Sequence, residues 1–192
     1  MASIKAKELE AFVAAGRRMY EGGLSSGTGG AIGARLSGEV VAVTAAGTRL
    51  GFLGRGDILL MNGAGPIGQN VREPGRETGI IRAVLAAQPE AGSVIKVNSP
   101  FTTALAHRGR KTIEASRGLL EDLGGVVFVP YYRPGTAGLA GAVAEVLRSC
   151  RIAIIEGQGA VVWGTDTQDA IDHAEDLEAA ARVIFILDGK EV

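Results

Sequence analysis

The sequence is poor in the residues that most often bind transition metals or form disulfides. Its 192 residues include 2 histidines and 1 cysteine, Cys150. A single cysteine cannot form an internal disulfide, which favours a reducing, cytoplasmic compartment. There is no C-x-x-C or H-x-x-x-H pattern, so the sequence contains no ordinary zinc motif.

Long apolar runs and an excess of charge of one sign are also absent. No apolar segment approaches the roughly 20 residues that span a bilayer, and residues 1–5 lack the apolar stretch of a signal peptide. The 20 basic and 21 acidic residues give a net charge of −1, whereas nucleic-acid-binding domains are usually strongly basic. We therefore expect neither a membrane protein nor a nucleic-acid-binding protein.

Glycine is abundant, and its 29 residues cluster between apolar segments, which is typical of tight turns. The apolar periodicity between these turns predicts helices and short strands. We expect one α/β domain over residues 1–192. The expected helices are 5–21, 77–87, 101–107, 138–149 and 167–187, and the expected strands are 40–43, 57–61, 93–97, 126–130, 151–155 and 160–164, the last two as a hairpin.

Two glycine-rich segments are candidate binding motifs. Gly63–Gly68 matches G-x-G-x-x-G, but Pro66 and the polar residues after it do not predict the helix that a dinucleotide site needs, so we interpret the segment as a turn. In Gly23–Gly33, glycine amides and Ser and Thr hydroxyls could bind a phosphate or carboxylate. The same segment could equally be a turn between a helix and a strand.

Short motifs in the first half of the chain resemble a known family, the class II aldolase/adducin family, which includes the fuculose- and rhamnulose-phosphate aldolases. Gly23–Arg35 is similar to the family pattern G-L-x-x-G-T-x-G-N-x-S-x-R. Val43–Gly47 is similar to I-T-P-[ST]-G, and Leu53–Ile58 follows it at the position of L-x-x-x-D-I.

The resemblance continues over nearly the whole chain. Gly75–Thr78 stands where the family has S-S-E before a helix, and Gln88–Asn98 where it has R-P-D-A followed by V-H-x-H. Pro130–Thr136 is similar to P-Y-x-x-x-G-T, and Gln158–Ala160 to H-G-[LV]. The resemblance implies a three-layer α/β/α fold with a central, mostly antiparallel sheet. It also implies self-association as a cyclic homotetramer with sites at subunit boundaries.

The family's metal ligands are replaced. In its metal-dependent members, the histidines of H-x-H and of H-G bind a divalent cation, commonly zinc, and here those positions are Lys96, Asn98 and Gln158. An amide oxygen is a poor zinc ligand, and an ammonium repels a cation. His107 and His173 lie elsewhere, and we expect them at the surface or in packing contacts. We predict that no zinc and no other cofactor binds at these positions.

The resemblance also implies a site for a small anionic or phosphorylated ligand and a general acid/base. Glu77 matches the family's acid/base glutamate, although a glutamate at the start of a helix is also favoured by the helix dipole. Ala31 and Gly75 replace an asparagine and a serine of the family's phosphate site. The expected substrate-binding residues are Thr28, Gly29, Gly30, Thr44, Gly47 and Arg76.

Lys96 permits two hypotheses. In the one we favour, its ammonium replaces the charge of the lost metal and pairs with Glu77 or Glu156. In the other, a desolvated Lys96 with a lowered pKa forms a Schiff base with a carbonyl substrate. The tyrosine that family members receive from a neighbouring subunit would fall near Ile113–Ala115, where this chain has none.

Three functions follow from the resemblance and its departures. The chain is expected to be a relative of sugar-phosphate aldolases, which are aldehyde-lyases, without conventional zinc-dependent aldol cleavage. One alternative is a metal-independent lyase or epimerase that acts on a small sugar phosphate through Glu77 and Lys96. The other is a non-catalytic binding or assembly module, for which the adducin head domain is a precedent in the family.

Overall fold

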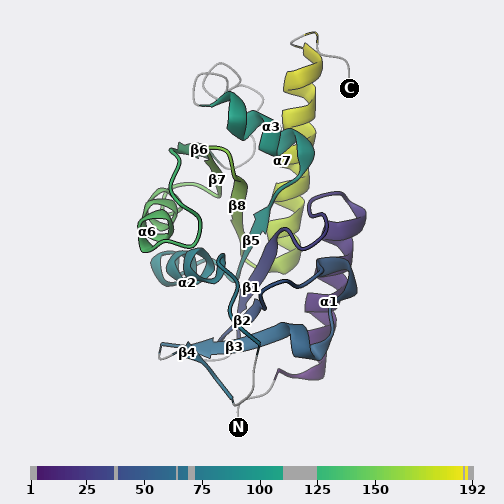
Figure 1. Ribbon diagram of the computed structural model, residues 1–192, viewed down its shortest axis with the longest axis vertical. Coiled ribbons are helices and arrows are strands. Elements are labelled where there is room, and N and C mark those ends of the chain that lie inside the picture. The colour runs from purple at the N-terminus through teal and green to yellow at the C-terminus, as the bar shows by residue number, and fades with distance from the viewer. Residues whose placement is uncertain are drawn as a thin grey trace.

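A single sheet of eight strands runs through the described part of the computed structural model, which covers residues 4–36, 39–63, 65–68, 72–109, 125–187 and 189 (Figure 1). Neighbouring strands are antiparallel except β6 and β7, which are parallel, so the prediction of a mostly antiparallel sheet is confirmed. In sheet order the strands are β4 (Gly65–Pro66), β3 (Ile58–Asn62), β2 (Val41–Thr44), β1 (Ala31–Arg35), β5 (Ser93–Val97), β8 (Gly159–Gly164), β7 (Ile152–Ile155) and β6 (Val126–Val129).

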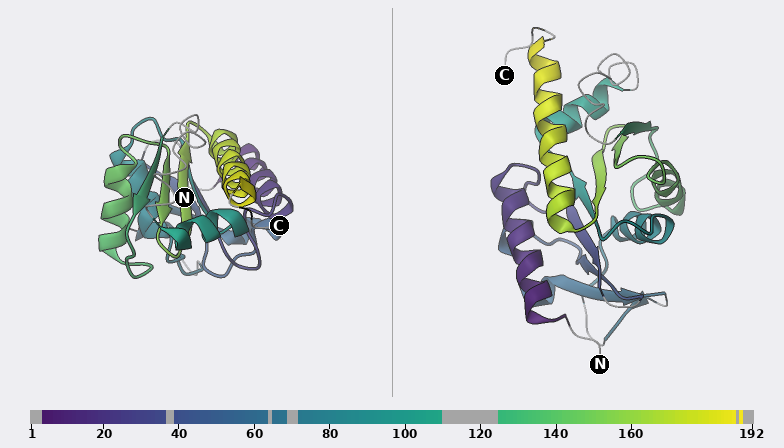
Figure 2. Two further views of the ribbon diagram at one scale, coloured as in Figure 1. Left: turned by 90° about the horizontal axis from the view of Figure 1, so that it is seen from above. Right: turned by 180° about the vertical axis from the view of Figure 1, so that it is seen from behind.

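Helices cover both faces of the sheet, as the three-layer prediction requires (Figure 2). One face packs against α1 (Ala6–Glu21), α3 (Pro100–Arg108) and α7 (Thr167–Leu187), and the other against α2 (Thr78–Ala87) and α6 (Ala137–Val146). Short 3₁₀ turns, η1 (Leu50–Phe52) and η2 (Arg55–Asp57), lie between β2 and β3. Each face has its own apolar cluster of buried side chains, and the sheet separates the two.

The predicted helices and strands lie within three residues of the observed ones, but two strands were missed, β1 and the two-residue β4. The glycine-rich segment after α1 was interpreted as turns, and its second half is β1, in the middle of the sheet. Alanine and glycine have little preference for strands, so local sequence does not reveal it. Tertiary packing explains why the strand contains a glycine at position 33, because a Cβ there would lie only 2.2 Å from Cγ2 of Ile81. Gly33 therefore lets α2 pack directly onto the sheet.

None of the described residues of the segment Gly63–Gly68 lies in a helix. Gly65 and Pro66 form the short strand β4, which pairs with the end of β3 as a hairpin. The prediction of a plain turn is therefore only partly right, because Gly65 and Pro66 belong to the sheet, and the segment lacks the helix that a dinucleotide motif needs. In the described residues, no helix is long and apolar enough to cross a membrane.

Helix α3 is attached firmly to α7 at its first turn. The Glu178 carboxylate of α7 accepts hydrogen bonds from the backbone N–H groups of Phe101 (2.9 Å) and Thr102 (2.8 Å) and from the Thr102 hydroxyl (2.7 Å). These N–H groups have no partner within their own helix, so a carboxylate from another helix both caps and positions α3.

We expect Gly33→Ala to lower the free energy of unfolding by about 1–3 kcal/mol, since the added methyl overlaps the buried Ile81 and overpacking costs about this much. Gly79→Ala on α2 is the matched control. Its added methyl meets no atom within 4 Å, and removing a helical glycine stabilises by about 0.5–1 kcal/mol. Urea unfolding of both variants measures the two effects. Equal stability of Gly33→Ala and the wild type would contradict the packing of α2 on β1.

Candidate active site

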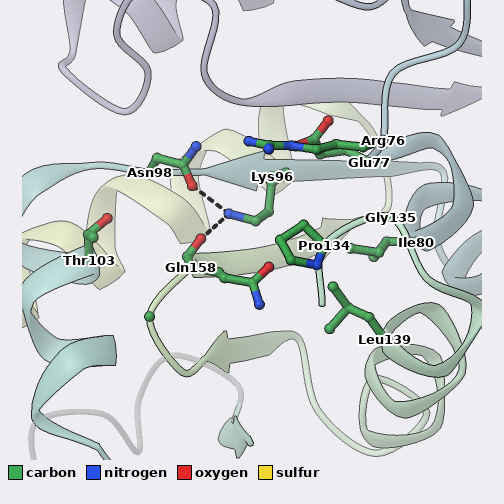
Figure 3. A pocket seen from close by; sticks show the side chains of 11 residues that line it. Arg76, Glu77, Ile80, Lys96, Asn98, Thr103, Pro134, Gly135, Leu139 and Gln158 are labelled. Carbon is green, nitrogen blue, oxygen red and sulfur yellow. Dashed lines mark hydrogen bonds and ion pairs between the residues drawn. The ribbon is translucent and has the colours of Figure 1, made fainter. Parts of the chain in front are cut away.

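A pocket of about 330 Å³ opens where the end of β5 meets the turn between β7 and β8 (Figure 3). The residues just before α2 contribute Arg76 and Glu77 to its wall. The end of β5 contributes Lys96 and Asn98, and the turn contributes Gln158. Five residues that the sequence singled out are therefore brought together in one place.

Strand geometry explains why three of these residues converge. Lys96 and Asn98 are two residues apart at the end of β5, so their side chains leave the strand on the same side. The pairing of β5 with β8 places Val97 opposite Ala160, which brings the turn at Gln158 beside the end of β5. Gly159 has a φ of +80°, and a Cβ there would lie 2.3 Å from the Val97 carbonyl oxygen. A glycine after Gln158 is needed for this close approach.

The Lys96 ammonium is held by three oxygen atoms. Its Nζ donates hydrogen bonds to Oδ1 of Asn98 (2.5 Å), to the backbone carbonyl of Val97 (3.1 Å) and to the backbone carbonyl of Gln158 (Figure 3). An ammonium has three N–H donors, so each donor has an acceptor. The residue is 5% exposed, which makes it a buried, fixed positive charge on the pocket wall.

The predicted ion pair of Lys96 with Glu77 or Glu156 is wrong, because none of these three acceptors is a carboxylate oxygen. Glu77 instead accepts a hydrogen bond from Nε of Arg76 at 2.9 Å. Glu156 accepts one from the backbone N–H of Tyr131 at 3.0 Å. The physical reason is that Val97 at the end of β5 and Gln158 in the turn between β7 and β8 present backbone carbonyl oxygens next to the ammonium, and these take two of its donors.

Burial lowers the pKa of Lys96 from its ordinary value of 10.5 to about 8. The Glu77 carboxylate raises this pKa, and the Arg76 guanidinium lowers it. At neutral pH the side chain is therefore mainly protonated and acts as a cation. Near pH 8 and above, a substantial neutral fraction exists, so the Schiff-base hypothesis stays open in that range.

A second, smaller hollow adjoins the pocket at Glu77. It is lined by Thr28, Gly30, Thr44 and Gly47, four of the predicted anion-binding residues, and measures about 20 Å³. This volume admits about one water molecule, so a phosphate must bind at its mouth or widen it. Gly29 lies outside it, near Asn98, where a Cβ on Gly29 would be 3.2 Å from Nδ2 of Asn98. Whether these residues bind an anion stays a prediction.

The residues at the three positions that the resemblance equates with metal ligands do not have the donor chemistry that zinc prefers. They offer an ammonium and two carboxamides, and Lys96 directs its charge to the point where Asn98 and Gln158 meet. Within the described ranges, no group of three or more His, Cys, Asp and Glu side chains could hold a metal ion. His107 is exposed on α3, and His173 lies 3.4 Å from Asp169 on α7.

Several pocket residues were not singled out from the sequence. Thr103 on α3 and Leu139 on α6 belong to no motif, and only the fold brings them to the pocket. Pro134 and Gly135 lie within the matched P-Y-x-x-x-G-T motif, which was the one available signal for that wall. The position of the missing neighbouring-subunit tyrosine, Ile113–Ala115, lies outside the described residues.

Stability should rise with pH between about 8 and 10.5 because of Lys96. Below pH 8 the lysine is protonated in both the folded and the unfolded chain, and the full cost of burying its charge is present. Between the two pKa values the unfolded chain binds more protons, so deprotonation favours the folded state by up to about 3 kcal/mol.

The measurement is the difference in unfolding free energy between the wild type and Lys96→Met, followed by urea unfolding from about pH 7 to about pH 11. Because Lys96→Met carries no titrating group at this position, the subtraction isolates the lysine. A difference that stays constant across this range would contradict the lowered pKa.

The sequence and the fold resemble those of known proteins. The model of the class II aldolase and adducin N-terminal domain family matches residues 10–185. The 3-oxo-tetronate 4-phosphate decarboxylase of Haemophilus influenzae is 30% identical over 199 residues, which cover 100% of this chain and 92% of that protein. The structure of YgbL from Klebsiella pneumoniae has a TM-score of 0.83 at 26% identity, over 99% of this chain and 94% of that one.

The L-fuculose-1-phosphate aldolase of Thermus thermophilus has a TM-score of 0.79 at 22% identity, over 98% of this chain and 99% of that one. At 22% identity this likeness shows a shared fold. Family membership is shown by the family model and by the decarboxylase relative. The chain belongs to the class II aldolase and adducin family.

Proposed function

We propose that this chain is a metal-independent carbon–carbon lyase that acts on a small phosphorylated sugar acid or ketose. One observation carries the proposal: the buried Lys96 ammonium occupies the meeting point of the three positions that correspond to metal ligands in the resembled family. In this proposal the Lys96 ammonium, a cation attached to the chain, takes the place of the divalent metal ion of the resembled family. Glu77 lies on the same pocket wall as a proton donor and acceptor.

The chemistry requires such a positive charge. Aldol cleavage and decarboxylation of a 3-oxo acid both leave an electron pair on a carbon next to a carbonyl group, and the charge moves onto the carbonyl oxygen. In the decarboxylation, the bond between C1 and C2 breaks, carbon dioxide leaves, and C2 of the resulting enolate then takes up a proton. The charge of Lys96 stabilises the oxyanion, and Glu77 supplies the proton.

A phosphorylated sugar acid suits the charges and the size of the pocket. The decarboxylase relative is named for a substrate that carries both a carboxylate and a phosphate. Lys96 and Arg76 line this pocket with two positive charges, and the Arg76 guanidinium also pairs with Glu77 at 2.9 Å, so the cationic wall suits an anionic ligand. A volume of 330 Å³ is at the small end of the range of about 300–1,000 Å³ for ligand sites, which suits a short carbon chain.

A non-catalytic binding module is the second candidate, and one observation favours it. All three N–H donors of Lys96 are already bonded to protein oxygens, so the residue offers a ligand its charge but no free proton. Such a pocket can bind an anion without converting it.

We also propose that the chain forms a homotetramer. The proposal is supported by the exposed apolar side chains Val183, Ile186 and Leu187 near the end of α7.

Turnover should depend on Lys96 and not on a metal. We expect the wild type to release carbon dioxide from a 3-oxo sugar-acid phosphate, or to cleave a ketose phosphate, at the same rate with and without EDTA. Lys96→Met should lower kcat by about 100-fold or more, as the loss of an oxyanion-stabilising group does. Lys7→Met, which removes an exposed lysine of α1, is the matched control and should leave kcat unchanged.

The outcomes separate the two candidate functions. Turnover that is lost in EDTA and restored by zinc would overturn the metal-independent mechanism. Tight binding of the substrates without any turnover by the wild type would support the non-catalytic module instead.

The triple variant Lys96→His, Asn98→His, Gln158→His should bind about one zinc ion per chain, because the backbone already brings the three positions together. Metal analysis after dialysis against zinc is the measurement, with the wild type and Lys96→His alone as controls that bind none. If the triple variant folds but takes up no zinc, the three positions do not form a former metal site.

A further inference from the structure

The amide group of Asn98 has one end fixed and one end free. Its Oδ1 accepts a hydrogen bond from Nζ of Lys96 at 2.5 Å, and its Nδ2 points away from the ammonium (Figure 3). Because an ammonium can only donate, this partner determines which end of the amide faces it. Among the described residues Nδ2 has no hydrogen-bond acceptor, and it is not closed to solvent. Asn98, which lines the pocket, therefore presents N–H donors that a ligand can use.

The neighbours of Asn98 fix its backbone and leave room for its amide. Its backbone N–H donates to the Leu24 carbonyl at 3.2 Å. A Cβ on Gly159 would lie 3.1 Å from Oδ1, and a Cβ on Gly29 would lie 3.2 Å from Nδ2. Both distances are shorter than ordinary van der Waals contacts, so a larger residue at either position would crowd the amide. The two glycines thus keep space free at both ends of the amide.

The side-chain nitrogens of the other two residues at the equated metal-ligand positions are engaged within the protein. The three N–H groups of Lys96 donate to protein oxygens. Nε2 of Gln158 donates to the Tyr132 carbonyl at 2.7 Å. Of these three residues, Asn98 is therefore the one whose side-chain nitrogen has no protein acceptor in the described part of the chain.

We propose that Asn98 is a catalytic residue that donates a hydrogen bond from Nδ2 to the enolate oxygen of the reacting substrate. This inference rests on the proposed lyase function and adds the donor that Lys96 does not supply. A developing oxyanion is stabilised most by donors that already point toward it. Lys96 strengthens this donor, because a cation bonded to the amide oxygen polarises the N–H bonds at the other end of the amide.

Steady-state kinetics on the substrate that the wild type turns over give the first test. Asn98→Ala should lower kcat by about 10²–10³-fold, as the loss of one oxyanion donor does. KM should change little, because the charge on the enolate oxygen develops only during the reaction. A higher KM at an unchanged kcat would mean that Asn98 binds a group already charged in the substrate, such as the phosphate, and it would overturn the inference.

A double-mutant cycle separates direct donation from an effect that passes through Lys96. The probe is phosphoglycolohydroxamate, whose ionised form is a planar analogue of an enediolate, and isothermal titration calorimetry in EDTA measures its dissociation constant. Asn98→Ala should weaken binding about 10-fold or more, both in the wild type and in Lys96→Met, since a hydrogen bond to a charged group contributes about this much. If the effect disappears in the Lys96→Met background, Asn98 only positions the lysine and the inference is wrong.

Asn98→Asp keeps the contact with Lys96 and removes the donor. Its carboxylate has nearly the shape of the amide and still accepts from Nζ, so the fold should be kept even if Asn98→Ala unfolds. We expect this variant to lose at least as much affinity for the hydroxamate as Asn98→Ala, and unchanged affinity would refute the role of Nδ2. Gln168→Ala, which removes an exposed carboxamide of α7 outside the pocket, is the matched control and should bind as the wild type does.

The results distinguish this inference from the proposed function. If the wild type and the Asn98 variants bind the hydroxamate equally well, the role of Asn98 is refuted while the proposed lyase site stands. If the wild type neither binds the hydroxamate nor turns over any substrate, the proposed function falls, and the inference falls with it.

Discussion

The arrangement of the pocket depends on one buried ammonium group. Burying the charge of Lys96 is unfavourable, and the oxygens of Asn98, Val97 and Gln158 offset that cost by accepting its three hydrogen bonds. These bonds join the end of β5 to the turn between β7 and β8. They also set the orientation of the Asn98 amide, since an ammonium accepts no hydrogen bond. The positive charge of the pocket and the orientation of the Asn98 amide thus have a common origin.

The same arrangement limits the chemistry of the site. A bound metal ion can coordinate a substrate oxygen directly, whereas an ammonium whose donors are all occupied acts through its charge alone. Glu77, held by Arg76 at 2.9 Å, remains the ionisable group next to that charge. Lyase chemistry without a metal and simple anion binding both fit this environment. The site is a lyase only if the fixed charge of Lys96 stabilises the enolate enough for the carbon–carbon bond to break.

Much of the fold and part of the site could be predicted from the sequence. Apolar periodicity located the helices and most strands, and motif order brought Arg76, Glu77, Lys96, Asn98 and Gln158 into one expected site, which the structure places around one pocket. Strand β1 was missed because its alanines and glycine carry no local strand signal. Thr103 was missed because a threonine on a helix has no pattern that marks it as part of a pocket.

By itself, the sequence determined the family and the layered fold, and it predicted that a lysine and two amides stand at the positions of metal ligands, because these inferences depend on residue identity and local order. Only the tertiary structure decided which atoms hold the Lys96 ammonium, and it placed backbone carbonyls there instead of the expected carboxylates. It also decided that Thr103, on a helix that carries no motif, is one of the residues that line the pocket. Hydrogen-bond partners are chosen by proximity in space, and segments far apart in the chain supply them.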